Sequence, residues 1–248
     1  MSISAPEGTT LETLYNSIMK RFPFSLVLFA ILALTACKGE APKAEPSAPP
    51  ATGAKPVRSL PKILAFGDSL TAGLGLAQSA SYPALLQEKL DAAGFAYEVI
   101  NAGVSGDTSA GGVRRIDWAL EPGVKIVILE LGANDILRGQ SVEAMKQNLA
   151  LIIERIQARG AKVLLAGMEA PTSSGIEYRK PVHEAFASLA ASHHVEFVPF
   201  LLAGVAGLES LNQRDGIHPN EEGTKIVAEN VFQALKPMLE AEKQKAAE

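Results

Sequence analysis

The sequence predicts an α/β fold, a three-layer α/β/α sandwich around a parallel sheet of about five strands. From Pro61 onward, short apolar runs alternate with stretches of helical spacing, which is typical of a parallel sheet covered by helices. One run, 124–131, is rich in β-branched residues and apolar on both faces, as a central parallel strand is. The 248-residue chain is 47% hydrophobic and 20% charged, which is the composition of a globular protein with a sizeable core.

The individual elements follow from local patterns. Short apolar runs predict strands at 62–67, 97–101, 124–131, 161–168 and 195–200. Apolar residues at helical spacing predict helices at 82–94, 110–120, 141–160, 177–194 and 220–239. Ser141 is a suitable N-cap for the third of these helices, and Gly94 and Gly160 are suitable helix ends.

The N-terminal region has the pattern of an export signal. Lys20 and Arg21 precede an apolar run, 22–36, that is shorter than the roughly 20 residues of a membrane-spanning helix. The run ends in Leu-Thr-Ala-Cys, which resembles the lipobox of bacterial lipoproteins and implies cleavage before Cys37 and lipidation of that cysteine. A buried cysteine at the end of an anchor helix is the alternative. Met19 fits a signal start better than Met1, because Glu7 and Glu12 precede it.

These patterns divide the chain into three parts. Residues 1–36 are predicted to be a leader with a lipoprotein signal peptide, and 37–60 a lipid-anchored linker rich in proline and alanine. Residues 61–248 are predicted to form one folded domain. The expected location is therefore the bacterial cell envelope, with the protein lipid-anchored on the periplasmic face, at the outer membrane because Lys38 rather than aspartate follows the cysteine.

Charge and cysteine content exclude several classes of function. The net charge is −4, and no long basic block is present, which argues against a nucleic-acid partner. The single cysteine excludes an intrachain disulfide and a zinc site of clustered cysteines. We expect a monomer that uses no metal and no cofactor.

Four polar stretches fall at or near the ends of predicted strands, at 67–70, 101–108, 131–139 and 215–219. Ligands of parallel sheets bind outside the carboxyl ends of the strands, so these loops are expected to meet. Together they supply a serine, a histidine, an aspartate and two candidate oxyanion donors, which are the parts that nucleophilic catalysis needs.

His218 is the strongest candidate for the base among the histidines. His183 is expected inside a helix, and His193 and His194 at a helix end, where a solvated role is the simplest expectation. His218 follows Asp215 by three residues on a turn that contains glycine. Taken alone, this Asp-x-x-His spacing also fits a turn at a helix entry, and metal binding is a further alternative that no second ligand cluster supports.

The four stretches, FGDSL, NAGVSGDT, LGANDILRG and DGIHP, occur in the order found in the SGNH (GDSL) hydrolase family. The chain most resembles its thioesterase I, lysophospholipase L1 and arylesterase group, over 62–239. The resemblance implies the flavodoxin-like hydrolase fold for 61–248, with Ser69 as nucleophile, His218 as general base and Asp215 as the carboxylate that orients the histidine. It also implies an oxyanion hole made by the backbone N–H groups of Ser69 and Gly106 and the side-chain amide of Asn134.

Other residues near these motifs are expected to be structural or concern substrate preference. Pro-Thr-Ser-Ser-Gly, 171–175, departs from the Pro-x-Asn-x-Gly loop of the related group, which leaves substrate preference open. Asp68 and Asp135 are expected to accept hydrogen bonds from loop N–H groups rather than to take part in the chemistry. Trp118 is expected to pack against a helix.

The expected activity is metal-free hydrolysis of carboxylic esters and thioesters through an acyl-enzyme. The expected substrates are aryl esters, lysophospholipids and acyl thioesters. Two alternatives are kept: an O-deacetylase of envelope polysaccharide, which would need aromatic residues to stack on sugars, and a lipid-anchored binding module without turnover.

Overall fold

The computed structural model describes residues 60–245. Its centre is a five-stranded sheet in the order β2-β1-β3-β4-β5, in which every neighbouring pair is parallel. The strands are β1 (Lys62–Gly67), β2 (Glu98–Gly103), β3 (Val124–Glu130), β4 (Lys162–Ala166) and β5 (Glu196–Val198). The predicted parallel sheet is confirmed.

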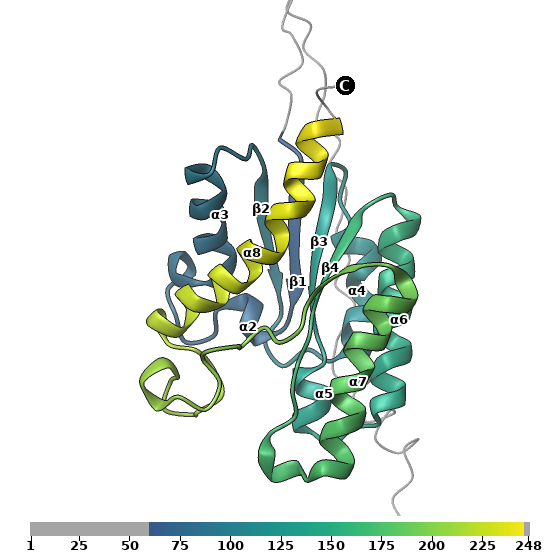
Figure 1. Ribbon diagram of the computed structural model, residues 1–248, viewed down its shortest axis with the longest axis vertical. Coiled ribbons are helices and arrows are strands. Elements are labelled where there is room, and N and C mark those ends of the chain that lie inside the picture. Colours follow the sequence, from purple (N-terminus) through teal and green to yellow (C-terminus); the bar gives the residue numbers. More distant parts are fainter. Residues whose placement is uncertain (1–59, 246–248) are drawn as a thin grey trace, which may run out of the picture. The chain divides into compact units, whose positions relative to one another are not determined.

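Five long helices cover the two faces of this sheet (Figure 1). On one face, α3 (Tyr82–Ala92) packs against α8 (Glu221–Lys245). On the other, α6 (Val142–Ala158) packs against both α4 (Ser109–Ala119) and α7 (Ile176–His193). The three-layer α/β/α architecture is therefore confirmed. The helix bounds agree with those expected to within two residues, except that α8 continues to Lys245 rather than ending at 239.

The core lies between the sheet and the helices that cover its two faces. Ile126, Val127, Ile128 and Leu129 are all fully buried, because helices cover both faces of the central strand β3. The N-cap prediction is also confirmed, since the Ser141 side chain accepts a hydrogen bond from the Ala144 N–H at the start of α6.

The expectation for Trp118 is wrong. The side chain lies on the outer face of α4 and is 85% exposed, so it packs against no helix. The buried face of α4 is formed instead by small residues and Ile116, which turns the position of Trp118 outward.

Two short helices begin at the carboxyl ends of strands, where only loops were expected. They are α2 (Ser69–Ala72), which follows β1, and α5 (Ala133–Leu137), which follows β3. Figure 1 shows both at the same edge of the sheet. The part of the chain that the structure describes also has three single-turn 3₁₀ segments, at Gln78–Ala80, Thr172–Ser174 and Glu209–Leu211.

The predicted leader, lipidation site and most of the linker, residues 1–59, lie outside the described residues. Within residues 60–245, no helix is both long enough and apolar enough to span a bilayer.

Candidate active site

Ser69 is the first residue of α2, and one residue separates it from the end of β1. The preceding Asp68 caps this helix by accepting a hydrogen bond from the Leu70 N–H at 3.0 Å. A Cβ atom at Gly67 would collide with the Thr71 and Glu130 side chains, so glycine is required where the strand turns into the helix. The turn leaves Ser69 8% exposed, at the carboxyl edge of the sheet.

His218 and Asp215 continue a chain of hydrogen bonds from this serine. The Ser69 Oγ lies 2.8 Å from His218 Nε2, and His218 Nδ1 lies 2.7 Å from Asp215 Oδ2. Because an ionised carboxylate can only accept, His218 Nδ1 donates to Asp215, and Nε2 is left to accept the hydroxyl proton of Ser69. The three predicted catalytic residues are thus brought together in the geometry of a nucleophile, a base and an orienting carboxylate.

The turn that contains Asp215 keeps its carboxyl ionised. Asp215 Oδ1 accepts hydrogen bonds from the backbone N–H groups of His218 at 3.0 Å and Ile217 at 2.9 Å. These bonds lower the pKa of Asp215 to about 2, with the His218 N–H as the largest cause. The Asp-x-x-His spacing is therefore both a turn and part of a catalytic constellation, so the two interpretations of the sequence are compatible.

Three candidate oxyanion donors lie beside the serine. Among residues 60–245, the backbone N–H groups of Ser69 and Gly106 have no hydrogen-bond acceptor in the protein, which leaves both available to a ligand. Gly106 has a positive φ of 80°, which explains glycine at this position. Asn134, in α5, donates one of its two amide hydrogens to Asp68 Oδ2 at 3.0 Å and keeps the other available.

Arg138 links two of these donors, a role that sequence reasoning missed. Its Nη2 donates to the Gly106 carbonyl oxygen at 2.9 Å and to Asn134 Oδ1 at 3.3 Å. Since the amide oxygen of Asn134 faces Arg138, the amide nitrogen is oriented toward Asp68 and the serine. The position of Arg138 within the LGANDILRG stretch was the only sequence signal for this role.

Arg115 holds the loop before α4 against the sheet. Its guanidinium donates to Asp107 Oδ2 at 2.7 Å and to the carbonyl oxygens of Ala102 and Gly67, both at 2.8 Å. It also lies 3.8 Å from the centre of the Phe66 ring, a cation–π contact. The loop that carries Gly106 is therefore tied to the end of β1, next to Ser69.

Two buried carboxyls support the strand-to-helix turn. Glu130 Oε2 accepts hydrogen bonds from the Asp68 N–H at 3.1 Å and the Thr71 hydroxyl at 2.7 Å. Burial raises the pKa of Glu130 well above its usual range, and the neighbouring Asp68 raises it further. Burial likewise raises the pKa of Asp68 to about 6, against the lowering effect of its bonds from Leu70 and Asn134.

The predicted roles of Asp68 and Asp135 are therefore structural in this geometry. Asp68 bonds the Leu70 N–H and the Asn134 amide, as described above. Asp135 accepts from the Ser109 N–H at 2.8 Å and the Ser109 hydroxyl at 2.6 Å, which joins α5 to the start of α4. Neither carboxyl contacts His218 through a hydrogen bond, so neither belongs to the chain that starts at Ser69.

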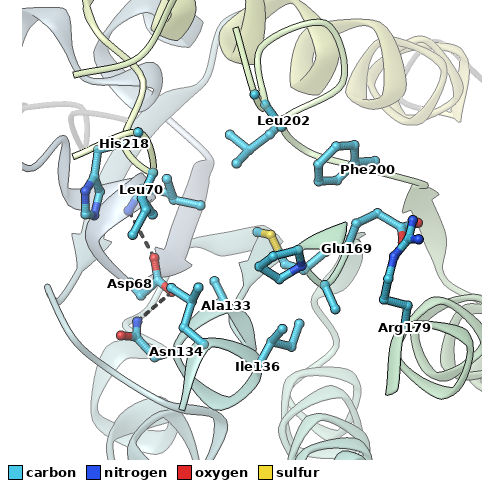
Figure 2. Close-up of a pocket in the computed structure, with 18 of the residues that line it drawn as sticks. Asp68, Leu70, Ala133, Asn134, Ile136, Glu169, Arg179, Phe200, Leu202 and His218 are labelled. Atoms are coloured by element: carbon cyan, nitrogen blue, oxygen red, sulfur yellow. Dashed lines mark hydrogen bonds between the residues drawn. The ribbon is translucent and has the colours of Figure 1, made fainter. Parts of the chain in front are cut away.

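An apolar cavity of about 1050 Å³ opens from these groups. Ser69, Gly106, Asn134 and His218 line one end. Figure 2 shows Ala133, Ile136, Phe200 and Leu202 around its middle, between the catalytic groups and Arg179. The loop 171–175, whose sequence departs from the pattern of the related group, contributes Pro171 and Thr172 to the wall and so borders the cavity.

Comparisons with known proteins identify the family of this chain. The model of the GDSL-like lipase/acylhydrolase family matches residues 65–226. The chain belongs to this family. The chain is 43% identical to Esterase TesA of Pseudomonas aeruginosa over 71% of its own length and 89% of that protein. It is 34% identical to thioesterase 1/protease 1/lysophospholipase L1 of Escherichia coli over 71% of its own length and 84% of that protein.

A solved structure of a relative shows the same fold. The psychrotrophic esterase EstA from Pseudoalteromonas sp., described as inhibited by monoethylphosphonate, is 34% identical and superposes with a TM-score of 0.69. The match covers 73% of this chain and 99% of that one. The predicted family, fold and class of enzyme, a hydrolase of ester bonds, are confirmed. The roles predicted for individual site residues stay predictions, now with a geometry that suits them.

Proposed function

We propose that this protein is a serine esterase that hydrolyses carboxylic esters and thioesters through an acyl-Ser69 intermediate. The observation that carries the proposal is the continuous hydrogen-bond chain from Ser69 through His218 to Asp215, at the end of an apolar cavity. The relatives named esterase, thioesterase and lysophospholipase support it. We therefore propose aryl esters, lysophospholipids and acyl thioesters as its substrate classes.

In the first half of the reaction, Ser69 Oγ forms a bond to the carbonyl carbon, and His218 Nε2 takes the hydroxyl proton. The carbonyl oxygen becomes an oxyanion that accepts hydrogen bonds from the Ser69 and Gly106 N–H groups and the Asn134 amide. The bond to the leaving oxygen or sulfur then breaks, and the leaving group receives the proton from His218. Asp215 stabilises the imidazolium that forms between these steps.

In the second half, water replaces the leaving group. His218 Nε2 takes a proton from the water as its oxygen attacks the acyl carbon, and the same donors bind the second oxyanion. The bond to Ser69 Oγ breaks, the serine recovers the proton, and the carboxylic acid departs. Every proton moves between the substrate, water, Ser69 and His218, so this scheme requires no metal and no organic cofactor.

The lining of the cavity favours acyl chains over sugars. A polysaccharide deacetylase would need aromatic side chains to stack on sugar rings, and Phe200 is the one Phe, Tyr or Trp among the described lining residues. Trp118 is exposed on α4 and lines no part of the cavity. A binding module without turnover has no need for the Ser69–His218 contact or for unbonded N–H groups beside it.

A panel of p-nitrophenyl esters of graded chain length, assayed beside an acetylated glycan, tests the proposal. We expect kcat/KM to rise from acetate to medium-chain esters, by up to about fourfold per methylene, because each buried methylene contributes about 0.8 kcal/mol. A preference for the acetate, together with faster release of acetate from the glycan, would support the deacetylase instead. No hydrolysis of any ester would support the binding module.

We further propose that the mature protein is a lipoprotein anchored through Cys37 to the envelope, at the outer membrane, and that it acts as a monomer. The Leu-Thr-Ala-Cys stretch after a short apolar run supports the anchor, and a site supplied wholly by one chain supports the monomer. In cell fractionation, we expect Cys37→Ala to move the protein out of the outer-membrane fraction. A variant that stays in the membrane would show that the apolar run is the anchor.

The oligomeric state is tested by analytical ultracentrifugation. A sedimentation mass of two chains would contradict the monomer.

A further inference from the structure

The end of the cavity farthest from the catalytic groups is charged. Arg179, Lys180 and His183, all on α7, line this end together with Glu169, which follows β4. Figure 2 shows Arg179 and Glu169 at the opposite side of the cavity from His218 and Asn134. A pocket that bound only a hydrocarbon chain would have no use for cations at its end.

The Arg179 side chain is half-buried, and one of its nitrogens lacks a hydrogen-bond partner. Its Nε is fully buried and has no hydrogen-bond acceptor, and among residues 60–245 its side chain has no ion-pair partner. Burying a charged donor without an acceptor is strongly unfavourable, so such groups are normally paired. Nε itself is closed off from the cavity, but the half-buried Arg179 side chain lines it, so a carboxylate on a bound ligand could pair with the other guanidinium nitrogens.

The neighbouring charges leave this end of the cavity positive. The Glu169 carboxylate is engaged by His183, whose Nδ1 lies 2.6 Å from Glu169 Oε1. Lys180 is held only weakly, with its Nζ 3.9 Å from Glu184 Oε1 and its side chain 71% exposed. Two permanent cations, Arg179 and Lys180, therefore face one carboxylate, Glu169, among the residues that line this end.

The catalytic geometry determines which part of a substrate reaches Arg179. His218 must protonate the leaving group, so the alcohol or thiol part lies on the His218 side of the scissile carbon. The acyl chain then extends away from His218, past Ile136 and Phe200, toward Arg179 (Figure 2).

We propose that Arg179, with Lys180 at the rim, forms an anion subsite for the far end of the acyl chain, so that the preferred substrates are esters or thioesters of medium-chain dicarboxylic acids with one free carboxylate. The apolar middle of the cavity holds the methylenes, and the guanidinium pairs with the terminal carboxylate through two parallel hydrogen bonds. This inference rests on the esterase function proposed above.

The experiment compares p-nitrophenyl monoesters of dicarboxylic acids of six, eight and ten carbons with p-nitrophenyl esters of fatty acids of the same lengths. For the wild-type enzyme we expect one dicarboxylic monoester to exceed its fatty counterpart in kcat/KM. Arg179→Ala should reduce kcat/KM for that monoester by roughly tenfold to a hundredfold, as loss of a charged hydrogen-bonded pair does, and leave the fatty ester within about twofold.

Matched variants separate a specific subsite from general effects of charge. Arg159→Ala removes an exposed arginine outside the cavity and should leave kcat/KM unchanged for both types of ester. Arg179→Lys should restore part of the lost activity, since a cation remains without the planar fork. For an octanoate ester whose alcohol part bears the carboxylate, Arg179→Ala should leave kcat/KM unchanged. If Arg179→Ala lowers kcat/KM for that ester alone, the assignment of the subsite to the acyl side is overturned.

Binding gives a readout that does not require turnover. We expect calorimetry to show that octanedioate binds wild-type protein more tightly than Arg179→Ala, with no such difference for octanoate. Equal binding of octanedioate to both proteins would overturn the subsite, whether or not the enzyme is active.

The kinetic results separate failure of the subsite from failure of the esterase proposal. If fatty esters are hydrolysed and the preference for monoesters is the same in both proteins, the subsite is wrong and the esterase proposal stands. If no ester is hydrolysed, the esterase proposal fails, and octanedioate binding still decides the subsite.

Discussion

Replacing Ser69 with alanine is expected to lower kcat for p-nitrophenyl octanoate by roughly 10⁴- to 10⁶-fold. The variant removes the oxygen that would carry the acyl group, and His218 then has no hydroxyl 2.8 Å from its Nε2 to deprotonate. The remaining donors can still polarise a carbonyl, so a small residual rate from direct attack by water is expected. Steady-state kinetics, with a fluorophosphonate probe that labels only the wild type, measure the effect.

The fold should survive this change, because within residues 60–245 the only side-chain hydrogen bond of Ser69 is the one to His218. Ser188→Ala is a matched control: this half-buried serine on α7 lies outside the cavity, and its hydroxyl donates to the Ala185 carbonyl oxygen. It should keep wild-type activity and the wild-type thermal midpoint. Undiminished hydrolysis or unchanged labelling in Ser69→Ala would remove this residue from the mechanism.

Replacing Asn134 with alanine is expected to lower kcat by about 10²- to 10³-fold with little change in KM. The amide is oriented from both sides, by Arg138 at its oxygen and Asp68 at its nitrogen, and so is available where the oxyanion forms. Its contribution is made in the transition state rather than in the substrate complex, so kcat falls while KM does not. Stopped-flow kinetics of acylation would locate the loss in the chemical step.

A structural role for Asn134 would give a different result. Loss of its bond to Asp68 removes one of the interactions that lower the pKa of that carboxyl, so kcat should be compared over a pH series that extends well above 6. Asn148→Ala, which removes a half-buried amide bonded to Ser109 outside the cavity, is the matched control and should leave kcat within a few-fold. A lower thermal midpoint and higher KM with unchanged kcat in Asn134→Ala would contradict the oxyanion role.

Local patterns in the sequence determined the layers of the fold. A β-branched run that is apolar on both faces, such as 124–131, buries both faces only in a sheet that is covered on each side. The stretches of helical spacing between such runs form the helices that cover the sheet. The short helices α2 and α5 were missed because four or five residues hold too little periodicity to be distinguished from a loop. Trp118 was misplaced because size and apolarity alone do not indicate which face of a helix a residue occupies.

Part of the candidate site could be predicted from the sequence, and the rest depended on tertiary structure. The resemblance of the motifs to the SGNH family indicated Ser69, Gly106, Asn134, Asp215 and His218. The rule that strand ends of a parallel sheet meet at one edge predicted that their loops lie together. The tertiary structure alone brought Ser69 within 2.8 Å of His218 across 149 positions of the chain. Contacts over such separations depend on how helices and strands pack, which spacing along the chain does not record.

The same reason applies to the residues that no motif indicated. Glu130 is buried because its strand end lies under α2, and Arg138 bridges Gly106 and Asn134 because two loops meet there. Arg179 looks like an ordinary polar residue on an amphipathic helix, and only the folded chain shows that its guanidinium lines the cavity with a buried, unpaired nitrogen. The sequence by itself determined the fold and the class of chemistry, whereas burial and long-range contact decided which charged groups a substrate meets.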